Sequence, residues 1–560
     1  MSTVVRLSDE TIEVILDIVP VVASLLGLPG RDDRLPDFSE AGHEASIATA
    51  ADIAARAEAA DAESHDDQVT RAVIRHETAN IQDLLRARAV EYTVVDSDFA
   101  PVPEVLSMLP MLVLSQRVHA DGYLARLAKL PDMLATVAER HRIGLAGGRP
   151  AVRRLAEATV DYYDRMLADP EGLPLRRPTP AEDSQVDVAA FTAERDRLLD
   201  DVVRPALAKY REVLATEVVP HGRPDDRGGL CWLPGGDEIY TALVRSYITV
   251  DRTPEELHQT GLSIIARLAE EYVEIGEPVF GTTDLGEIWR GLRTDPAMRW
   301  KDADELLDAA RATILRAEEA APEWFGRLPG QRCQVEPIPA AEAPGSAGAY
   351  YMPPSLDGTR PGVYFANTHK AEERDRFTGE ATAFHEAVPG HHFQSCLALE
   401  LTDLPLLRRL SHFSAYLEGW GLYAERLADE MGLYSGPVAR LGMLSTDSLR
   451  AARLVVDTGL HAKGWSRQQA VDYMTANTPL ASVEIESEVD RYISAPGQAL
   501  SYMVGRLEID RMRADARRAL GDQFDIRGFH DTVLGEGPLP LGVLDEVVRS
   551  WVQEQQRSLA

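Results

Sequence analysis

The stretch that decides the fold and its chemistry is Phe377–Glu400, FTGEATAFHEAVPGHHFQSCLALE. It contains His385, Glu386, His391 and His392. Zinc hydrolases commonly carry H-E-x-x-H on one helix, with the histidines one turn apart and the glutamate as general base. Here the later histidines follow the first by six and seven positions, which an unbroken helix would separate by roughly 9 to 10.5 Å along its axis. That is too far for two imidazoles to share one ion at about 2.0 to 2.1 Å.

Pro389 and Gly390 stand between the histidines. Proline lacks a backbone donor and glycine tolerates unusual dihedral angles, so we expect the helix to bulge there. If two residues loop out, His391 takes the place of the second histidine of H-E-x-x-H. We therefore favour His391 as the metal ligand and His392 as a substrate contact, with the reverse assignment left open.

A zinc hydrolase needs three protein ligands and an open position for water. We expect the third ligand from a second helix, HFSAYLEGWGLYAERLADEM, where apolar and aromatic neighbours leave Glu418 little solvated face. Gly419 and Gly421 are small enough to let another helix approach closely. Glu425, seven positions after Glu418, shares its face and is predicted to accept a hydrogen bond from a metal-bound imidazole.

Two later segments carry further polar groups. RAARLVVDTGLH, residues 450–461, places Arg450, Arg453, Asp457 and His461 near one helical face, which is too polar for a plain core face. EVDRYISAPGQALSYMVGR, residues 488–506, adds Arg491, Tyr492, Gln498 and Tyr502. A hydrolase that attacks an amide needs donors aimed at the oxyanion, and tyrosine, histidine and arginine can supply them. Aromatic packing is the alternative for the two tyrosines.

These considerations give each candidate residue a role. The predicted metal ligands are His385, His391 and Glu418, supported by the carboxylates of Glu425 and Asp457. The predicted catalytic group is Glu386, Tyr502, Tyr492, His461 and Arg491. The predicted substrate contacts are His392, Tyr350, Tyr351, Arg453 and Gln498.

The remainder of the chain is mostly helical in its hydrophobic periodicity. A Gly- and Pro-rich break at 219–236 separates a predicted N-terminal helical region, 1–220, from a predicted catalytic region, 221–560. We expect both to form one continuous fold around a cleft. Residues 335–367 are the only strand-like region, and they predict a small sheet beside the metal-site helix. Its edge can hold an extended peptide by strand addition, although a sheet that only supports the helix is an equal alternative.

Composition restricts the partners and the compartment. A net charge of -32 over 560 residues argues against nucleic acid or a membrane as a partner. The three cysteines are too widely separated for a disulfide framework. The N-terminal residues lack the basic segment of a signal peptide, and no apolar run is long enough to span a bilayer. We therefore predict a cytoplasmic protein, with the oligomeric state left open.

Several motifs carry a family resemblance. HEAVPGHHFQ, LEGWGLYAE, RLVVDTGLH and RYISAPGQALSY, in this order, together with GLCWLPGGDEIY and TPEELHQTGL, closely resemble the bacterial family called domain of unknown function 885. That family is similar to gluzincin metallopeptidases, which are mostly helical, with a deep channel and a small sheet edge beside the zinc. The resemblance implies one Zn²⁺ held by His385, His391 and Glu418, with Glu386 as the base.

We therefore expect a mainly α, zincin-like multi-helical protein with a channel and one small sheet. Its expected function is a zinc-dependent peptidase that hydrolyses short peptides by metal-activated water. Two alternatives stand beside it. One is a metal-dependent hydrolase of a non-peptide amide or ester, and the other is a non-catalytic ligand-binding protein with a degenerate metal site.

Overall fold

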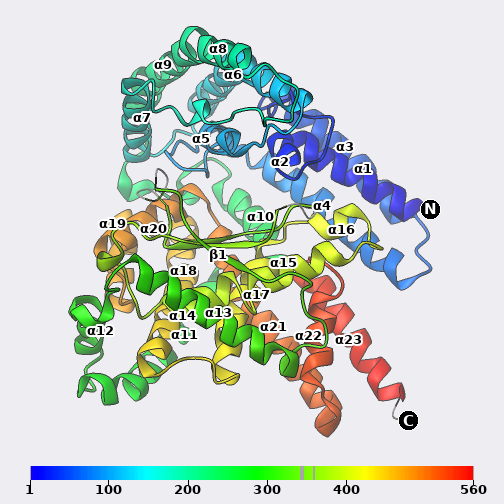
Figure 1. Cartoon of the computed structure of the whole chain (residues 1–560), viewed down its shortest axis with the longest axis vertical. Helices are drawn as coiled ribbons and strands as arrows, with labels where there is room; N and C mark the ends of the chain where they lie inside the picture. Colours follow the sequence, from blue (N-terminus) through cyan, green and yellow to red (C-terminus); the bar gives the residue numbers. More distant parts are fainter. Residues whose placement is uncertain (1, 341–342, 344–345, 357–359, 559–560) are drawn as a thin grey trace. The chain divides into compact units, whose positions relative to one another are not determined.

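The computed structural model describes residues 2–340, 343, 346–356 and 360–558. These residues are mainly helical with one small sheet, which confirms the predicted fold class (Figure 1). No helix among them has both the length and the apolar composition needed to cross a membrane.

The chain divides into two compact units. The first comprises Met1–Leu243, Leu460–Gln468 and Asp490–Pro496. The second comprises Val244–Gly459, Gln469–Val489 and Gly497–Ala560. The division therefore falls later than residue 220, and two short segments from the predicted catalytic region belong to the first unit.

The first unit is a helical bundle. Serine side chains begin three of its helices, where Ser2, Ser39 and Ser64 each accept a backbone N–H of the first turn. Its core is lined by apolar side chains such as Tyr123, Leu127 and Leu130, all fully buried. Its helices are α1 (Thr3–Ile18), α2 (Pro20–Leu25), α3 (Glu40–Ala59), α4 (His65–Arg86), α5 (Pro101–Met108), α6 (Arg117–Ala146), α7 (Arg153–Ala168), α8 (Val188–Leu198) and α9 (Arg204–Val213).

The second unit holds the predicted metal-site helices. Four helices, α10, α18, α19 and α20, contain residues of both units. The helices from α10 onward are α10 (Gly236–Ile248), α11 (Pro254–Phe280), α12 (Leu285–Thr294), α13 (Ala303–Trp324), α14 (Gly379–Glu386), α15 (His391–Glu400), α16 (Leu406–Leu410), α17 (Ser414–Glu430), α18 (Pro437–Ala462), α19 (Arg467–Asn477), α20 (Ser482–Ser494), α21 (Ser501–Leu520), α22 (Ile526–Leu534) and α23 (Leu541–Ser558).

Helices α17 and α21 pack closely because glycines meet at their crossing. A Cβ on Gly419 would lie 2.4 Å from Cα of Gly505, and a Cβ on Gly505 would lie 1.9 Å from the carbonyl oxygen of Ala415. Any larger side chain at either glycine would push the helices apart. The prediction that the glycine beside Glu418 admits a second helix is confirmed.

A three-stranded sheet, β1 (Gln334–Pro337), β3 (Val363–Ala366) and β2 (Ala349–Met352) in that order, occupies the predicted strand region. Strand β1 is parallel to β3 and β2 is antiparallel to it, with Tyr351 opposite Tyr364. The N–H of Asn367 bonds to the carbonyl of Gly348. Because hydrogen-bonded and non-bonded pairs alternate in an antiparallel ladder, the backbone groups of Tyr351 point away from β3. Strand β2 therefore presents an edge, and it packs against α14 and α15.

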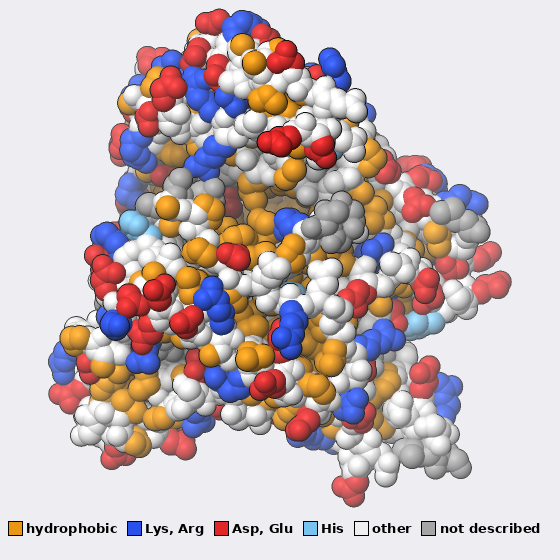
Figure 2. Space-filling view, in the orientation of Figure 1, with side chains coloured by type: hydrophobic (Ala, Val, Ile, Leu, Met, Phe, Trp, Pro, Cys, Tyr) orange, Lys and Arg blue, Asp and Glu red, His pale blue; other side chains and the backbone are white. Residues whose placement is uncertain are grey.

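Acidic residues outnumber basic residues in this chain, but the two kinds lie close to one another. On the face that Figure 2 shows, acidic and basic side chains are interspersed. Exposed arginines pair with neighbouring carboxylates, as Arg142 does with Glu217 at 2.6 Å. Exposed pairs of this kind contribute little to the free energy of folding, typically about 0 to 1 kcal/mol. Their main effect is to make the surface polar.

Candidate metal centre

The segment between His385 and His391 is a break between two helices, where the sequence predicted a bulge in one helix. Residues 387–390 form a turn that contains a cis Val388–Pro389 peptide bond. The indole N–H of Trp420 donates to the carbonyl of Pro389 at 2.9 Å and so fixes the turn to α17. A Cβ on Gly390 would lie 1.8 Å from the carbonyl oxygen of His385. Only glycine therefore lets the chain fold back so tightly.

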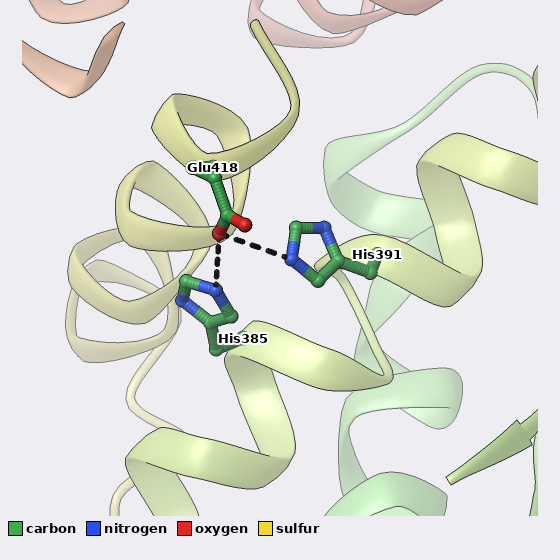
Figure 3. A group of neighbouring side chains, drawn as sticks. All are labelled: His385, His391 and Glu418. Carbon is green, nitrogen blue, oxygen red and sulfur yellow. Dashed lines mark hydrogen bonds and ion pairs between the residues drawn. The ribbon is translucent and has the colours of Figure 1, made fainter. Parts of the chain in front are cut away.

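The break brings the two histidines together. Their ring centres lie 4.7 Å apart with the rings nearly perpendicular. Nε2 of His385 and Nε2 of His391 lie 3.4 and 3.5 Å from the same carboxylate oxygen of Glu418 (Figure 3). Donor atoms that bind one ion at about 2.0 to 2.1 Å with tetrahedral angles are roughly 3.3 to 3.4 Å apart. These three residues could therefore hold a metal ion.

A buried carboxylate orients the first histidine. Nδ1 of His385 donates to Glu425 at 2.8 Å, and Glu425, fully buried, also accepts the hydroxyl of Thr446. Because Nδ1 bonds to Glu425, Nε2 is the nitrogen of His385 that faces Glu418. Gly421 makes room for this ring, because a Cβ there would lie 2.7 Å from Cε1 and Nε2 of His385. The geometry places Glu425 where the sequence expected a supporting carboxylate.

The electrostatics of the cluster favour positive charge. Burial lowers the pKa of His385, but hydrogen bonds to Glu418 and Glu425 outweigh that effect and raise the pKa to about 10. Burial raises the pKa of Glu418, but its contacts with His385 and His391 hold that pKa well below its ordinary value. Glu418 and Glu425 thus stabilise a positive charge on His385. A bound metal ion could take the place of that charge.

Glu386 is the last residue of α14 and follows His385 directly in the chain. Its Oε2 accepts the backbone N–H of Tyr351 at 3.1 Å. Since that N–H points away from β3, the bond joins Glu386 to the outer edge of β2. The bond to β2 orients the carboxylate of Glu386. Its other oxygen, Oε1, takes no part in this bond.

His392 contacts a different part of the protein from His391. Its Nδ1 accepts the hydroxyl of Tyr351 at 3.0 Å, and its Nε2 donates to the carbonyl of Gln331 at 2.9 Å. Both ring nitrogens are engaged inside the protein, and the residue is buried. The ring of Tyr350 stacks on Phe365 at 5.2 Å. Of the two adjacent histidines, the structure brings His391 to the cluster, and it ties the predicted substrate contacts His392 and Tyr351 to each other.

Tyr502, on α21, lies beside the cluster. Its ring stacks over the ring of His385 with 6.4 Å between centres. Two guanidinium carbons approach the same ring, that of Arg453 at 4.4 Å and that of Arg450 at 5.5 Å from its centre. Arg453 also pairs with Glu488 at 2.8 Å.

Asp457 supports the turn that precedes α21. Both of its carboxylate oxygens accept the backbone N–H of Gly497 at 3.1 Å, where the chain adopts a positive φ of 85°. Gln498 follows in a short 3-10 turn, Gln498–Leu500, that leads into the helix of Tyr502. The structure thus gives Asp457, predicted as a supporting carboxylate, a contact with the backbone turn that leads into the helix of Tyr502.

Three predicted catalytic residues belong to the first unit. Nδ1 of His461 accepts the N–H of Leu230 at 3.1 Å, and Nε2 donates to the carbonyl of Tyr492 at 2.9 Å. Burial lowers the pKa of His461 to about 4. The guanidinium of Arg491 lies 5.4 Å from the ring centre of Phe99. His461 and the carbonyl of Tyr492 thus bond to each other within the first unit, and Arg491 lies against Phe99 in the same unit.

Sequence reasoning missed two contributors to the site. From the sequence, Trp420 and Gly421 were only apolar or small neighbours of Glu418. In the structure, Trp420 bonds to the turn and Gly421 leaves space for the ring of His385. The G-W-G pattern around Trp420 was the available signal, because two glycines beside a buried aromatic residue indicate close approach on both sides.

Solved structures share the whole fold. A protein described as a "putative lipoprotein from Colwellia psychrerythraea" has a TM-score of 0.90 at 25% identity, with 99% of this chain and 100% of that chain covered. A "putative lipoprotein of unknown function from Shewanella oneidensis" has a TM-score of 0.76 at 18% identity, with 98% and 100% covered. "PZ peptidase A with inhibitor 2" reaches a TM-score of only 0.30 at 12% identity, with 94% and 98% covered, and carries no argument. No curated protein matches this chain.

The two lipoprotein descriptions contradict the predicted cytoplasmic location, which is wrong. The prediction rested on the spacing of cysteines and on the lack of a long apolar run. A fold that needs no disulfide is compatible with any redox compartment, and attachment through a lipid requires no membrane-spanning helix.

The sequence itself matches one family over nearly its whole length. The match covers residues 20–548, which begins earlier than the motifs had indicated. The chain therefore belongs to the family described as "Bacterial protein of unknown function (DUF885)".

Proposed function

We propose that the chain is a zinc-dependent peptidase of the gluzincin type that hydrolyses short peptides. The observation that carries this proposal is the spacing of His385, His391 and Glu418: the distances of 3.4 and 3.5 Å from the two histidine nitrogens to Glu418 are close to an edge of a tetrahedral zinc site, and all three donor atoms lie within 4.8 Å of one another. Two imidazoles, one carboxylate and an open fourth position form the ligand set of many catalytic zinc sites. Glu425 supports the proposal because metal-binding histidines usually donate their second nitrogen to a carboxylate.

The residues around this site have complementary tasks. A bound Zn²⁺ supplies Lewis acidity and lowers the pKa of water toward about 7. Glu386, oriented by the N–H of Tyr351, accepts the proton of the attacking water and passes it to the leaving amine. Tyr502, stacked over His385, donates its hydroxyl to the developing oxyanion.

The edge of β2 offers a place for the peptide backbone. The backbone groups of Ala349 and Tyr351 point away from β3. Since the N–H of Tyr351 donates to Glu386, the groups offered to a peptide are the carbonyl of Tyr351 and the N–H and carbonyl of Ala349. An extended peptide can add to such an edge through main-chain hydrogen bonds, which bind many sequences alike. Because Glu386 bonds to Tyr351, a peptide on this edge would have its backbone close to the base.

Glu386→Gln tests the proposal. We expect the zinc-loaded wild-type protein to cleave peptides in a mixed library, and we expect the variant to lose at least about a thousandfold in kcat while it keeps one zinc per chain. Glu380→Gln on the same helix is the matched control, since Glu380 bonds to the N–H of Ser435. Peptidase activity retained in Glu386→Gln, or no stoichiometric zinc after metal is added back, contradicts the proposal.

A further inference from the structure

Arg450 stands apart among the arginines around the metal centre. Its Nε is buried without a hydrogen-bond partner, and its guanidinium makes no ion pair with any residue that the structure describes. The contact that it makes is with the ring of Tyr502, at 5.5 Å. A half-buried guanidinium without a counter-ion is unfavourable unless something pairs with it. Its neighbour Arg453, by contrast, pairs with Glu488 at 2.8 Å.

One aromatic ring limits how far Arg450 can lie from the metal centre. Tyr502 lies against Arg450 on one side and stacks over His385 at 6.4 Å. The separation between the Arg450 guanidinium and the His385 ring therefore cannot exceed the sum of these two distances. A substrate whose scissile carbonyl lies at the metal carries a C-terminal carboxylate one residue, about 3.8 Å, further on. A guanidinium then binds that carboxylate at about 2.7 to 2.9 Å, and the sum of these spacings lies within the upper limit that the two ring contacts give.

We propose that Arg450 binds the free C-terminal carboxylate of the substrate, so that the enzyme releases single C-terminal residues. The inference rests on the proposed peptidase function. In the reaction, water adds across the last peptide bond: the hydroxyl joins the acyl carbon and the proton joins the nitrogen of the departing amino acid. The guanidinium fork matches a carboxylate in two parallel hydrogen bonds. Contact with the ring of Tyr502 keeps the guanidinium beside the residue that stacks over His385.

Binding measurements test this without turnover. Zinc-loaded Glu386→Gln protein is titrated by calorimetry with two peptides of the same sequence, one with a free C-terminal carboxylate and one with a C-terminal amide. We expect the acid to bind at least about tenfold more tightly than the amide, since a charge-assisted pair is lost with the amide. Adding Arg450→Gln should reduce this preference to about one. Equal binding of acid and amide to the Glu386→Gln protein, or equal weakening of both peptides by Arg450→Gln, overturns the inference.

A matched variant separates the role of Arg450 from a structural one. Arg453→Gln leaves Glu488 without its partner and should lower Tm, whereas Arg450→Gln leaves no carboxylate unpaired and should not lower Tm. Arg450→Lys provides a second comparison, because it keeps the charge without the planar fork and should show a preference between those of arginine and glutamine.

Cleavage of the same two peptides by the zinc-loaded wild-type protein distinguishes the two proposals. If it cleaves acid and amide at equal rates, the inference about Arg450 fails and the peptidase proposal stands. If it cleaves neither peptide and no library peptide, although the acid still binds through Arg450, the peptidase proposal fails and the carboxylate site stands.

Discussion

Nδ1 of His385 lies 2.8 Å from a carboxylate oxygen of Glu425, which is fully buried and comes from another helix. This bond selects which nitrogen of His385 faces His391 and Glu418. It therefore connects the packing of α14 against α17 to the chemistry of these three residues.

Glu425→Gln should weaken zinc binding about 10- to 100-fold, the usual effect of losing the carboxylate behind a metal-bound histidine. The amide still accepts a hydrogen bond but no longer carries the charge that makes the imidazole a stronger donor. A competition titration with a chromophoric chelator measures the change. Glu430→Gln, on the same helix but paired with Arg513, should leave zinc affinity unaltered; an equal loss in both variants would point to general damage to α17.

Gly421→Ala should disrupt the site through one methyl group. The added Cβ would lie 2.7 Å from Cε1 and Nε2 of His385, closer than carbon and nitrogen can approach without a shift. The ring must move away, and we expect zinc affinity to fall at least about tenfold. Gly436→Ala is the control because no atom lies within 4 Å of the position its Cβ would take. Wild-type zinc affinity in Gly421→Ala would show that the ring is not confined there.

Trp420→Phe should destabilise the protein and loosen the metal centre together. The change keeps an aromatic ring but removes the N–H that bonds to the carbonyl of Pro389, and it leaves a buried space. The free energy of unfolding should fall by about 2 to 4 kcal/mol, which urea titration measures. Because the turn between His385 and His391 then loses its anchor, zinc affinity should also decrease. A stability loss without any change in zinc affinity would separate the turn from the site.

The stability of the first unit should depend on pH through His461. Burial lowers its pKa to about 4 in the folded chain, against about 6.5 in the unfolded chain. The unfolded chain therefore takes up a proton first as the pH falls. The contribution of His461 is complete above pH 6.5 and decreases by about 1.4 kcal/mol per pH unit between 6.5 and about 4.

His461→Gln cannot titrate and should show a shallower decline in that pH window, even if it is less stable at pH 7 for want of a hydrogen bond. Urea titrations of both proteins at pH 4 to 7 check this. Parallel curves for the two proteins would mean that His461 does not contribute to the pH dependence.

Much of the architecture follows from local sequence patterns. Helical periodicity, serine and threonine caps and one aromatic, β-branched stretch are set by neighbours a few positions apart, so the helices and the location of the small sheet could be predicted. The same holds for the donors His385 and His391, because a helix breaker between clustered polar residues has no simple packing role. Glu418 stood out for a similar reason, as a carboxylate among apolar neighbours.

The sequence alone determined which residue types could form a metal centre, and the tertiary structure decided which of them meet. A helical face fixes spacing along one element, but it does not say which other element packs there. Only the packing of α17 against α14 puts Glu425 behind His385 and Gly421 beneath it. Packing also turned His392 toward Tyr351 and Gln331, and it left Arg450 without a carboxylate partner among the described residues. Contacts between distant segments depend on how whole helices fit together, and no local pattern carries that information.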